Sequence, residues 1–354
     1  MDRTSRQIDL GGVKVGGGAP VSVQSMTKTD TRDVESTVAQ IKRLEKAGCD
    51  IVRLAVPDME AAKALGEIKK KTEIPIVSDI HFDYKLALEA LRQGVDGMRI
   101  NPGNIGARYR IKAVVDAVKE RGVPIRIGVN SGSLEKDILN KYGSPTAEAL
   151  AESAMRHVNI LEDFDYRDIK ISVKSTDVKK MIAAYRLLAA RCEYPLHLGV
   201  TEAGTYELGT IKSSIGIGTL LAEGIGDTIR VSLTGDPVDE IVVGLNILKS
   251  LGLRQNGIEL ISCPGCGRLE IDLMKLVKDV EDRIADINLP RPIKVAILGC
   301  VVNGPGEASE ADIGIAGGRG KGMLYKDGKL VRSFKENRIV DELVKELETF
   351  AEPQ

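Results

Sequence analysis

Between residues 20 and 250 the chain alternates short apolar, β-branched runs with longer stretches in which apolar residues recur every three or four positions. The short runs predict strands and the longer stretches predict amphipathic helices. The predicted strands are 21–24, 51–54, 74–77, 97–100, 125–129, 169–173, 196–200 and 228–231. The helices that follow them are 34–47, 59–70, 85–93, 105–121, 147–162, 178–191, 206–222 and 239–251. Eight strand–helix units in succession favour an α/β fold of the (β/α)8 TIM barrel type over a doubly wound sheet.

After residue 251 this rhythm changes. The pattern predicts strands at 258–262, 294–298 and 312–316, helices at 269–284 and 338–350, and a hairpin at 323–333 around Asp327-Gly328, a typical two-residue turn. These elements suit a small α/β domain. We therefore expect a barrel over 1–252 and a second domain over 253–354.

Polar residues gather where the barrel strands end, which is where TIM barrels carry out their chemistry. They are Arg53, Asp79, His81, Arg99, Asn101, Arg126, Asn130, Lys174, Thr201, Glu202, Arg230 and Ser232. Two carboxylates, Asp79 and Glu202, leave three of the five cations unbalanced, and this excess suits a diphosphate. Any one of these arginines could instead form a structural salt bridge at the rim of the barrel and bind no ligand. Asp79 and Glu202 are the natural proton-transfer candidates, whereas His81 and His197 are expected to be wall residues.

Three cysteines in the second domain suggest a metal centre. Cys263 and Cys266 frame a Cys-Pro-Gly-Cys turn after one predicted strand, and Cys300 follows another. Three thiolates suit an iron–sulfur cluster or zinc, and zinc would normally add a histidine. Because every histidine lies far upstream, the pattern favours iron–sulfur with one position open to a weaker ligand or substrate. The other two cysteines, Cys49 and Cys192, are expected to be small buried hydrophobes.

Composition excludes several classes of partner. The net charge of −1 and the absence of Trp argue against nucleic acid. No apolar run approaches the length of a membrane span, and the N-terminus lacks the apolar core of a secretory signal. Together with few cysteines, this predicts a reduced, cytoplasmic protein without membrane contact.

Three other functions stay open on the residues alone. The first is a phosphate-binding aldolase or pterin-type transferase barrel with a structural zinc domain, which leaves the fourth zinc ligand unexplained. The second is an iron–sulfur carrier or redox sensor, which leaves the cationic mouth unexplained. A dithiol function for Cys263 and Cys266 is weaker, because their turn does not open a helix in a thioredoxin-like pattern.

The motifs in order resemble one family over essentially the whole chain. They are Val23-Gln24-Ser25-Met26-Thr27, Asp79-Ile80-His81-Phe82-Asp83, Arg99-Ile100-Asn101-Pro102-Gly103-Asn104, His197-Leu198-Gly199-Val200-Thr201-Glu202-Ala203-Gly204, Ser262-Cys263-Pro264-Gly265-Cys266-Gly267-Arg268 and Asn303-Gly304-Pro305-Gly306-Glu307-Ala308. The chain resembles the 4-hydroxy-3-methylbut-2-en-1-yl diphosphate synthases of the non-mevalonate isoprenoid pathway, in their two-domain form. The resemblance implies reductive opening of 2-C-methyl-D-erythritol 2,4-cyclodiphosphate to the linear allylic diphosphate with loss of water.

The resemblance also implies roles for particular residues. Cys263, Cys266 and Cys300 would hold a [4Fe-4S] cluster with Glu307 as its fourth, displaceable ligand. Glu202 matches the proposed acid or base and Asp79 a supporting carboxylate. The positions that match the family's diphosphate-binding residues are Arg53, Arg99, Asn101, Arg126, Asn130, Lys174, Arg230 and Ser232. Flavodoxin or ferredoxin would supply the electrons.

A head-to-tail homodimer is expected on topological grounds. Each barrel helix runs antiparallel to its strand, so the last helix ends at the face opposite the anion site. A cluster domain that follows this helix reaches a partner's barrel mouth more simply than its own. The family resemblance points to the same arrangement.

Overall fold

The computed structural model describes residues 3–254 and 258–351, apart from 285, 286, 288, 290 and 292. The chain divides into two compact units, Met1–Arg254 and Gln255–Gln354. Within the described ranges, no helix combines the length and the apolar character needed to cross a membrane.

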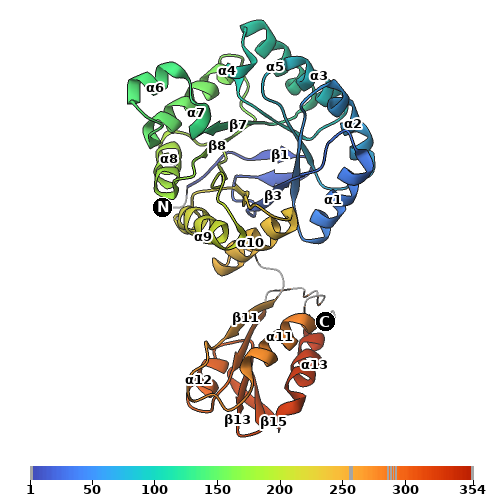
Figure 1. Cartoon of the computed structure of the whole chain (residues 1–354), viewed down its shortest axis with the longest axis vertical. Helices are drawn as coiled ribbons and strands as arrows, with labels where there is room; N and C mark the ends of the chain where they lie inside the picture. The colour runs from blue at the N-terminus through green and yellow to red at the C-terminus, as the bar shows by residue number, and fades with distance from the viewer. Residues whose placement is uncertain are drawn as a thin grey trace. The chain divides into compact units, whose positions relative to one another are not determined.

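The first unit contains a ring of parallel strands surrounded by helices (Figure 1). Among the described residues, the eight strands of this ring are β3 (Ser22–Met26), β4 (Ile51–Ala55), β5 (Ile76–Asp79), β6 (Gly97–Ile100), β7 (Ile125–Asn130), β8 (Ile169–Lys174), β9 (His197–Leu198) and β10 (Thr228–Ile229). They follow the order β8-β7-β6-β5-β4-β3-β10-β9. An isolated parallel bridge between Ile171 and Leu196 joins the two ends of this order. The predicted TIM barrel is confirmed.

Each strand is followed by a helix that packs outside the ring. These helices are α1 (Val34–Lys46), α2 (Met59–Lys70), α3 (Tyr84–Arg92), α5 (Arg108–Arg121), α7 (Ala147–Glu162), α8 (Val178–Arg191), α9 (Tyr206–Ala222) and α10 (Pro237–Ser250). Aspartate side chains cap the first turn of several of these helices. Asp58 accepts a hydrogen bond from the Ala61 amide at 2.9 Å, and Asp177 accepts one from the Lys180 amide at 3.0 Å. Such caps satisfy amides that have no partner within the helix.

The largest departures of the first unit from the predicted pattern are four. The helix predicted at 105–121 begins only at Arg108, as α5, and a separate short helix, α4 (Pro102–Ile105), precedes it. Gly106 between them adopts a φ of +92° that interrupts a helix. Regular pairing in the strands predicted at 196–200 and 228–231 covers only β9 and β10. Helix α6 (Lys136–Tyr142) was not predicted. Nor was the hairpin of β1 (Ile8–Leu10) and β2 (Val13–Val15), which packs its apolar side chains against Ile51 and Val77.

The described part of the second unit contains a sheet in the order β11-β12-β13-β14-β15. Its elements are β11 (Ile258–Ser262), α11 (Leu273–Ile284), β12 (Ile293–Leu298), α12 (Gly304–Ala308), β13 (Ile313–Gly318), β14 (Lys321–Lys326), β15 (Lys329–Lys335) and α13 (Ile339–Ala351). The first three strands are parallel and the last three antiparallel. Asp327 and Gly328 turn the predicted hairpin with φ values of +48° and +77°. Helix α11 begins later than predicted because Asp272 caps it, accepting from the Lys275 amide at 3.2 Å.

Candidate active site

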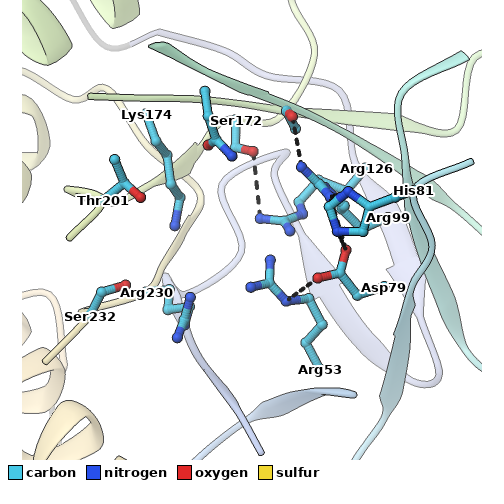
Figure 2. Close-up of a pocket in the computed structure, with 12 residues that line it drawn as sticks. Arg53, Asp79, His81, Arg99, Arg126, Ser172, Lys174, Thr201, Arg230 and Ser232 are labelled. Atoms are coloured by element: carbon cyan, nitrogen blue, oxygen red, sulfur yellow. Dashed lines mark hydrogen bonds and ion pairs between the residues drawn. The ribbon is translucent and has the colours of Figure 1, made fainter. Parts of the chain in front are cut away.

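A cavity of about 120 Å³ lies at the carboxyl ends of the barrel strands. Its lining is Arg53, Asp79, His81, Arg99, Arg126, Gly128, Asn130, Ser172, Lys174, Thr201, Arg230 and Ser232. Figure 2 shows side chains from several strands turned toward one shared space. All five cations that the sequence places at the mouth belong to this lining, because the ring of strands gathers the ends of different strands around one space.

Asp79 is held between two arginines. Its carboxylate accepts a hydrogen bond from Arg99 Nη1 at 3.1 Å and lies 3.6 Å from Arg53 Nε (Figure 2). Burial alone would raise the pKa of Asp79, but the Arg53 and Arg99 guanidinium groups outweigh it and hold that pKa at about 2. Asp79 is therefore ionised at neutral pH. It holds the two arginines in place, and its predicted part in proton transfer remains a prediction.

Glu240 of α10 is the second buried carboxylate beside the cations, and the sequence reading missed it. It is only 1% exposed, and its oxygens lie 3.6 Å from Arg230 Nη2 and 3.7 Å from Lys28 Nζ. It also accepts hydrogen bonds from the Leu233 amide at 3.1 Å and the Ser25 hydroxyl at 3.3 Å. The signal was available, since Glu240 falls on the otherwise apolar, inward face of its helix.

The positive charges of Arg126 and Lys174 lie near those of the other cations in the cavity, which repel them. Burial, followed by the charges of Arg53 and Arg99, shifts the pKa of Arg126 well below its usual value. Burial and then Arg230 do the same to the pKa of Lys174. Such a set gains most from a multivalent anion, because that anion replaces the lost hydration of several cations at once.

Glycines leave room for these long side chains. A Cβ on Gly128 would lie 2.6 Å from Arg99 Nε. A Cβ on Gly199 would lie 2.5 Å from the Arg230 carbonyl oxygen and 2.8 Å from Lys174 Nζ. The close approach of cation and backbone at these two positions therefore requires glycine.

Two predicted site residues lie outside the cavity lining. The Asn101 side chain is buried against Gly128, donating to its carbonyl and accepting from its amide, both at 2.9 Å. It thus fixes the end of β6 against β7. Glu202 is exposed, with a φ of +49°, whereas its neighbour Thr201 does line the cavity. The roles predicted for Asn101 and Glu202 remain predictions.

The histidines differ in position. His81 lines the cavity, and burial followed by the charge of Arg99 lowers its pKa. His197 is completely buried inside the barrel, with Nδ1 lying 3.4 Å from Thr228 Oγ1. Burial and then Arg126 shift the pKa of His197 well below its usual value, so it is neutral.

Two further residues of the lining, Ser172 and Gly128, were not predicted from the sequence, because small uncharged residues give no charge pattern.

The second unit has its own cavity, of about 230 Å³, where β11 and β12 end. Its lining includes Cys263, Cys266, Cys300 and Glu307. Among the residues described, no group of three His, Cys, Asp or Glu side chains is arranged to hold a single metal ion. Backbone hydrogen bonds, first from Asn303, lower the pKa of the Cys300 thiol. That favours the thiolate form in which cysteine binds iron.

The barrel cysteines are unlike these three. Burial raises the pKa of Cys49 to about 12 and also raises that of Cys192. The Cys49 thiol donates to the Ile51 carbonyl at 3.1 Å. Both therefore stay protonated, which separates them chemically from the cavity thiols.

Comparison with known proteins identifies the family. Residues 5–245 match the model of the GcpE TIM-barrel domain, and residues 259–349 match that of the GcpE protein C-terminal domain. The chain belongs to the GcpE family. Among its relatives, a Geobacter sulfurreducens protein is 61% identical over 348 residues, covering 98% of both chains. A Clostridium acetobutylicum protein is 61% identical over 344 residues, covering 97% of this chain and 98% of its own. Both are named 4-hydroxy-3-methylbut-2-en-1-yl diphosphate synthase (flavodoxin).

Among solved structures, dihydropteroate synthase from Stenotrophomonas maltophilia is similar to this GcpE protein in fold. The TM-score is 0.51 at 14% identity, over 70% of this chain and 98% of that one. At this identity the likeness concerns the barrel fold alone.

Proposed function

We propose that this GcpE-family protein is a 4-hydroxy-3-methylbut-2-en-1-yl diphosphate synthase. It would open 2-C-methyl-D-erythritol 2,4-cyclodiphosphate reductively, with loss of water, to give (E)-4-hydroxy-3-methylbut-2-enyl diphosphate for isoprenoid biosynthesis. The observation that carries this function is a pair of cavities in one chain, one lined by five cations and the other by three thiols. The name shared by its relatives supports the same activity.

The barrel residues would bind and orient the diphosphate. Arg53 and Arg99, oriented by Asp79, present guanidinium forks from one side, and Lys174 and Arg230 lie on the other (Figure 2). Breaking the bond between carbon and the ring oxygen leaves that oxygen, with its negative charge, on phosphorus. The fixed cations would stabilise this developing charge without reorganising. Ser232 and Asn130 add hydrogen-bonding groups to the lining.

The second unit would hold an iron–sulfur centre, for which we propose the [4Fe-4S] type. Cys263, Cys266 and Cys300 supply soft thiolate ligands around one cavity, and the lowered pKa of Cys300 suits ligation. Glu307 lines the same cavity and would be a weaker, displaceable oxygen ligand. When bound, such a centre supplies single electrons and a Lewis-acidic iron.

Glu202 remains the proposed acid or base for the loss of water. It follows Thr201, which lines the cavity, and its carboxylate is exposed and makes none of the ion pairs found among the described residues. Asp79, already committed to two arginines, would support it by holding the cations in place. Of the two predicted electron donors, the relatives' names favour flavodoxin over ferredoxin. A cytoplasmic location is part of the same proposal.

EPR spectroscopy tests this function. Protein prepared without oxygen and reduced with dithionite should give an iron–sulfur signal whose shape changes when the cyclic diphosphate is added. Elemental analysis of the same sample provides the control for metal identity. Zinc without sulfide would contradict the proposal and favour a phosphate-binding barrel with a structural metal domain.

We further propose a head-to-tail homodimer. Because each barrel helix runs antiparallel to the strand before it, α10 is expected to end at the face opposite the cationic cavity. The cysteine-bearing unit follows α10 in the sequence. Subunits carrying Cys263→Ala, mixed with subunits carrying Glu202→Gln, should then recover part of the wild-type activity, because one composite site per dimer is intact. Mixed dimers that form but stay inactive would contradict a shared active site.

A further inference from the structure

Lys170 lies inside the barrel but is not part of the cavity lining. It is on β8, is 1% exposed, and pairs in register with Arg126 of β7. In the part of the chain that the structure describes, its Nζ has no hydrogen-bond partner. Nε2 of His197, whose pKa the charge of Lys170 helps to lower, is buried without a partner as well.

The charges that act on Lys170 are both positive. Arg126 of β7 and Arg53 of β4 repel it, and both of them line the cavity. On β9, His197 is neutral. The two buried carboxylates beside the cavity cations are already engaged, Asp79 of β5 by Arg53 and Arg99, and Glu240 of α10 by Arg230 and Lys28.

A buried amine with two cationic neighbours and no anion favours its neutral form. Burial first, then Arg126 and Arg53, lowers the pKa of Lys170 to about 7. An anion in the cavity would offset the positive potential of the same two arginines. A bound anion therefore weakens the repulsion that favours the neutral form of Lys170.

We propose that Lys170 takes up a proton when a diphosphate binds in the cavity. This residue is a charge-compensating group that does not itself touch the ligand. The inference rests on the proposed function for the identity of the anion. With Lys170 neutral, the empty barrel contains one positive charge fewer and less repulsion among its cations. With Lys170 protonated, the barrel that holds the anion contains one positive charge more.

Coupling between proton uptake by Lys170 and binding of the anion predicts how the affinity changes with pH. If the bound state has the higher pKa, binding consumes a proton and is tightest at low pH. Affinity should then fall as the pH rises above about 7, by at most about tenfold per pH unit for one proton.

Calorimetric titration of the full-length protein tests the proposal. The probe is the cyclic diphosphate, because each phosphorus in its ring keeps one strongly acidic oxygen and the ligand itself does not titrate near neutral pH. Titrations at about pH 8 in buffers of different ionisation enthalpy give the number of protons taken up. We expect Lys170→Met to take up fewer protons than the wild type, although Lys174 in the cavity lining can still take up its own. Lys179→Met, which alters an exposed lysine of α8, should match the wild type.

Uptake by Lys170→Met equal to that of the wild type would overturn the proposal and direct attention to Lys174. Should Lys170→Met not fold, Lys170→Gln gives the same comparison. Wild-type protein that binds without proton uptake between about pH 6 and about pH 9 also overturns it, and leaves the proposed function intact. Failure of the wild type to bind the cyclic diphosphate at all would sink the proposed function itself.

Discussion

Replacement of Cys300 by alanine is expected to abolish both iron binding and turnover. Cys300 is one of three thiols around the cavity of the second unit, and backbone hydrogen bonds lower the pKa of its thiol. Two cysteines and a carboxylate would be left, too few soft ligands for a stable cluster. Iron and sulfide analysis, the visible absorption of the cluster and anaerobic turnover would all fall to background.

Binding of the cyclic diphosphate by the barrel should survive this change, since the cations come from residues before 254. The matched control is Cys192→Ala, which removes a half-buried thiol whose Sγ donates to the Leu188 carbonyl at 3.4 Å. It should keep its iron and activity. A Cys300→Ala protein with full iron and sulfide would contradict the assignment of this ligand.

Replacement of Asp79 by asparagine should lower the free energy of unfolding by about 3 kcal/mol, because removing one partner of a buried ion pair leaves the other charge uncompensated. Here two guanidinium groups, of Arg53 and Arg99, would lose their counter-ion inside a cationic cavity. Urea unfolding at neutral pH measures the change. Asp116→Asn is the control, because its ion pair with Lys112 is exposed and contributes little.

The same carboxylate predicts a pH dependence. The pKa of Asp79 falls from 3.8 to about 2 on folding. Its stabilising contribution is therefore present above pH 3.8 and is lost as the pH falls through about 2. Over this window the wild type should lose stability more steeply than Asp79→Asn. Parallel curves for the two proteins would mean that Asp79 is not the counter-ion of these arginines.

Much of the fold was predictable because local and global preferences agree. The bounds of α2, α7 and β6 match the apolar periodicity, and an aspartate or threonine caps the start of both helices. The misses have physical causes. The break at Gly106 depends on one backbone angle. The regular pairing of β9 and β10 covers two residues each, and such bounds depend on backbone hydrogen bonds that a residue pattern does not specify.

The candidate site was only partly predictable. Reading the strand ends found the five cations, because strand alternation decides which side chains enter the barrel. Glu240 reaches them from a helix, and Lys170 lies further inside, so neither follows from strand ends. The exposed position of Glu202 depends on a left-handed backbone conformation, for which its sequence position carries no signal.

Product analysis tests the proposed activity most directly. Iron-loaded protein would be incubated without oxygen with reduced flavodoxin and the cyclic diphosphate, and the products separated and identified by mass and NMR. We expect the linear allylic diphosphate to appear with two electrons consumed per molecule, and none to form without the donor. A cyclic diphosphate that binds in the cavity yet is recovered unchanged, with iron and reduced donor both present, would contradict the assignment.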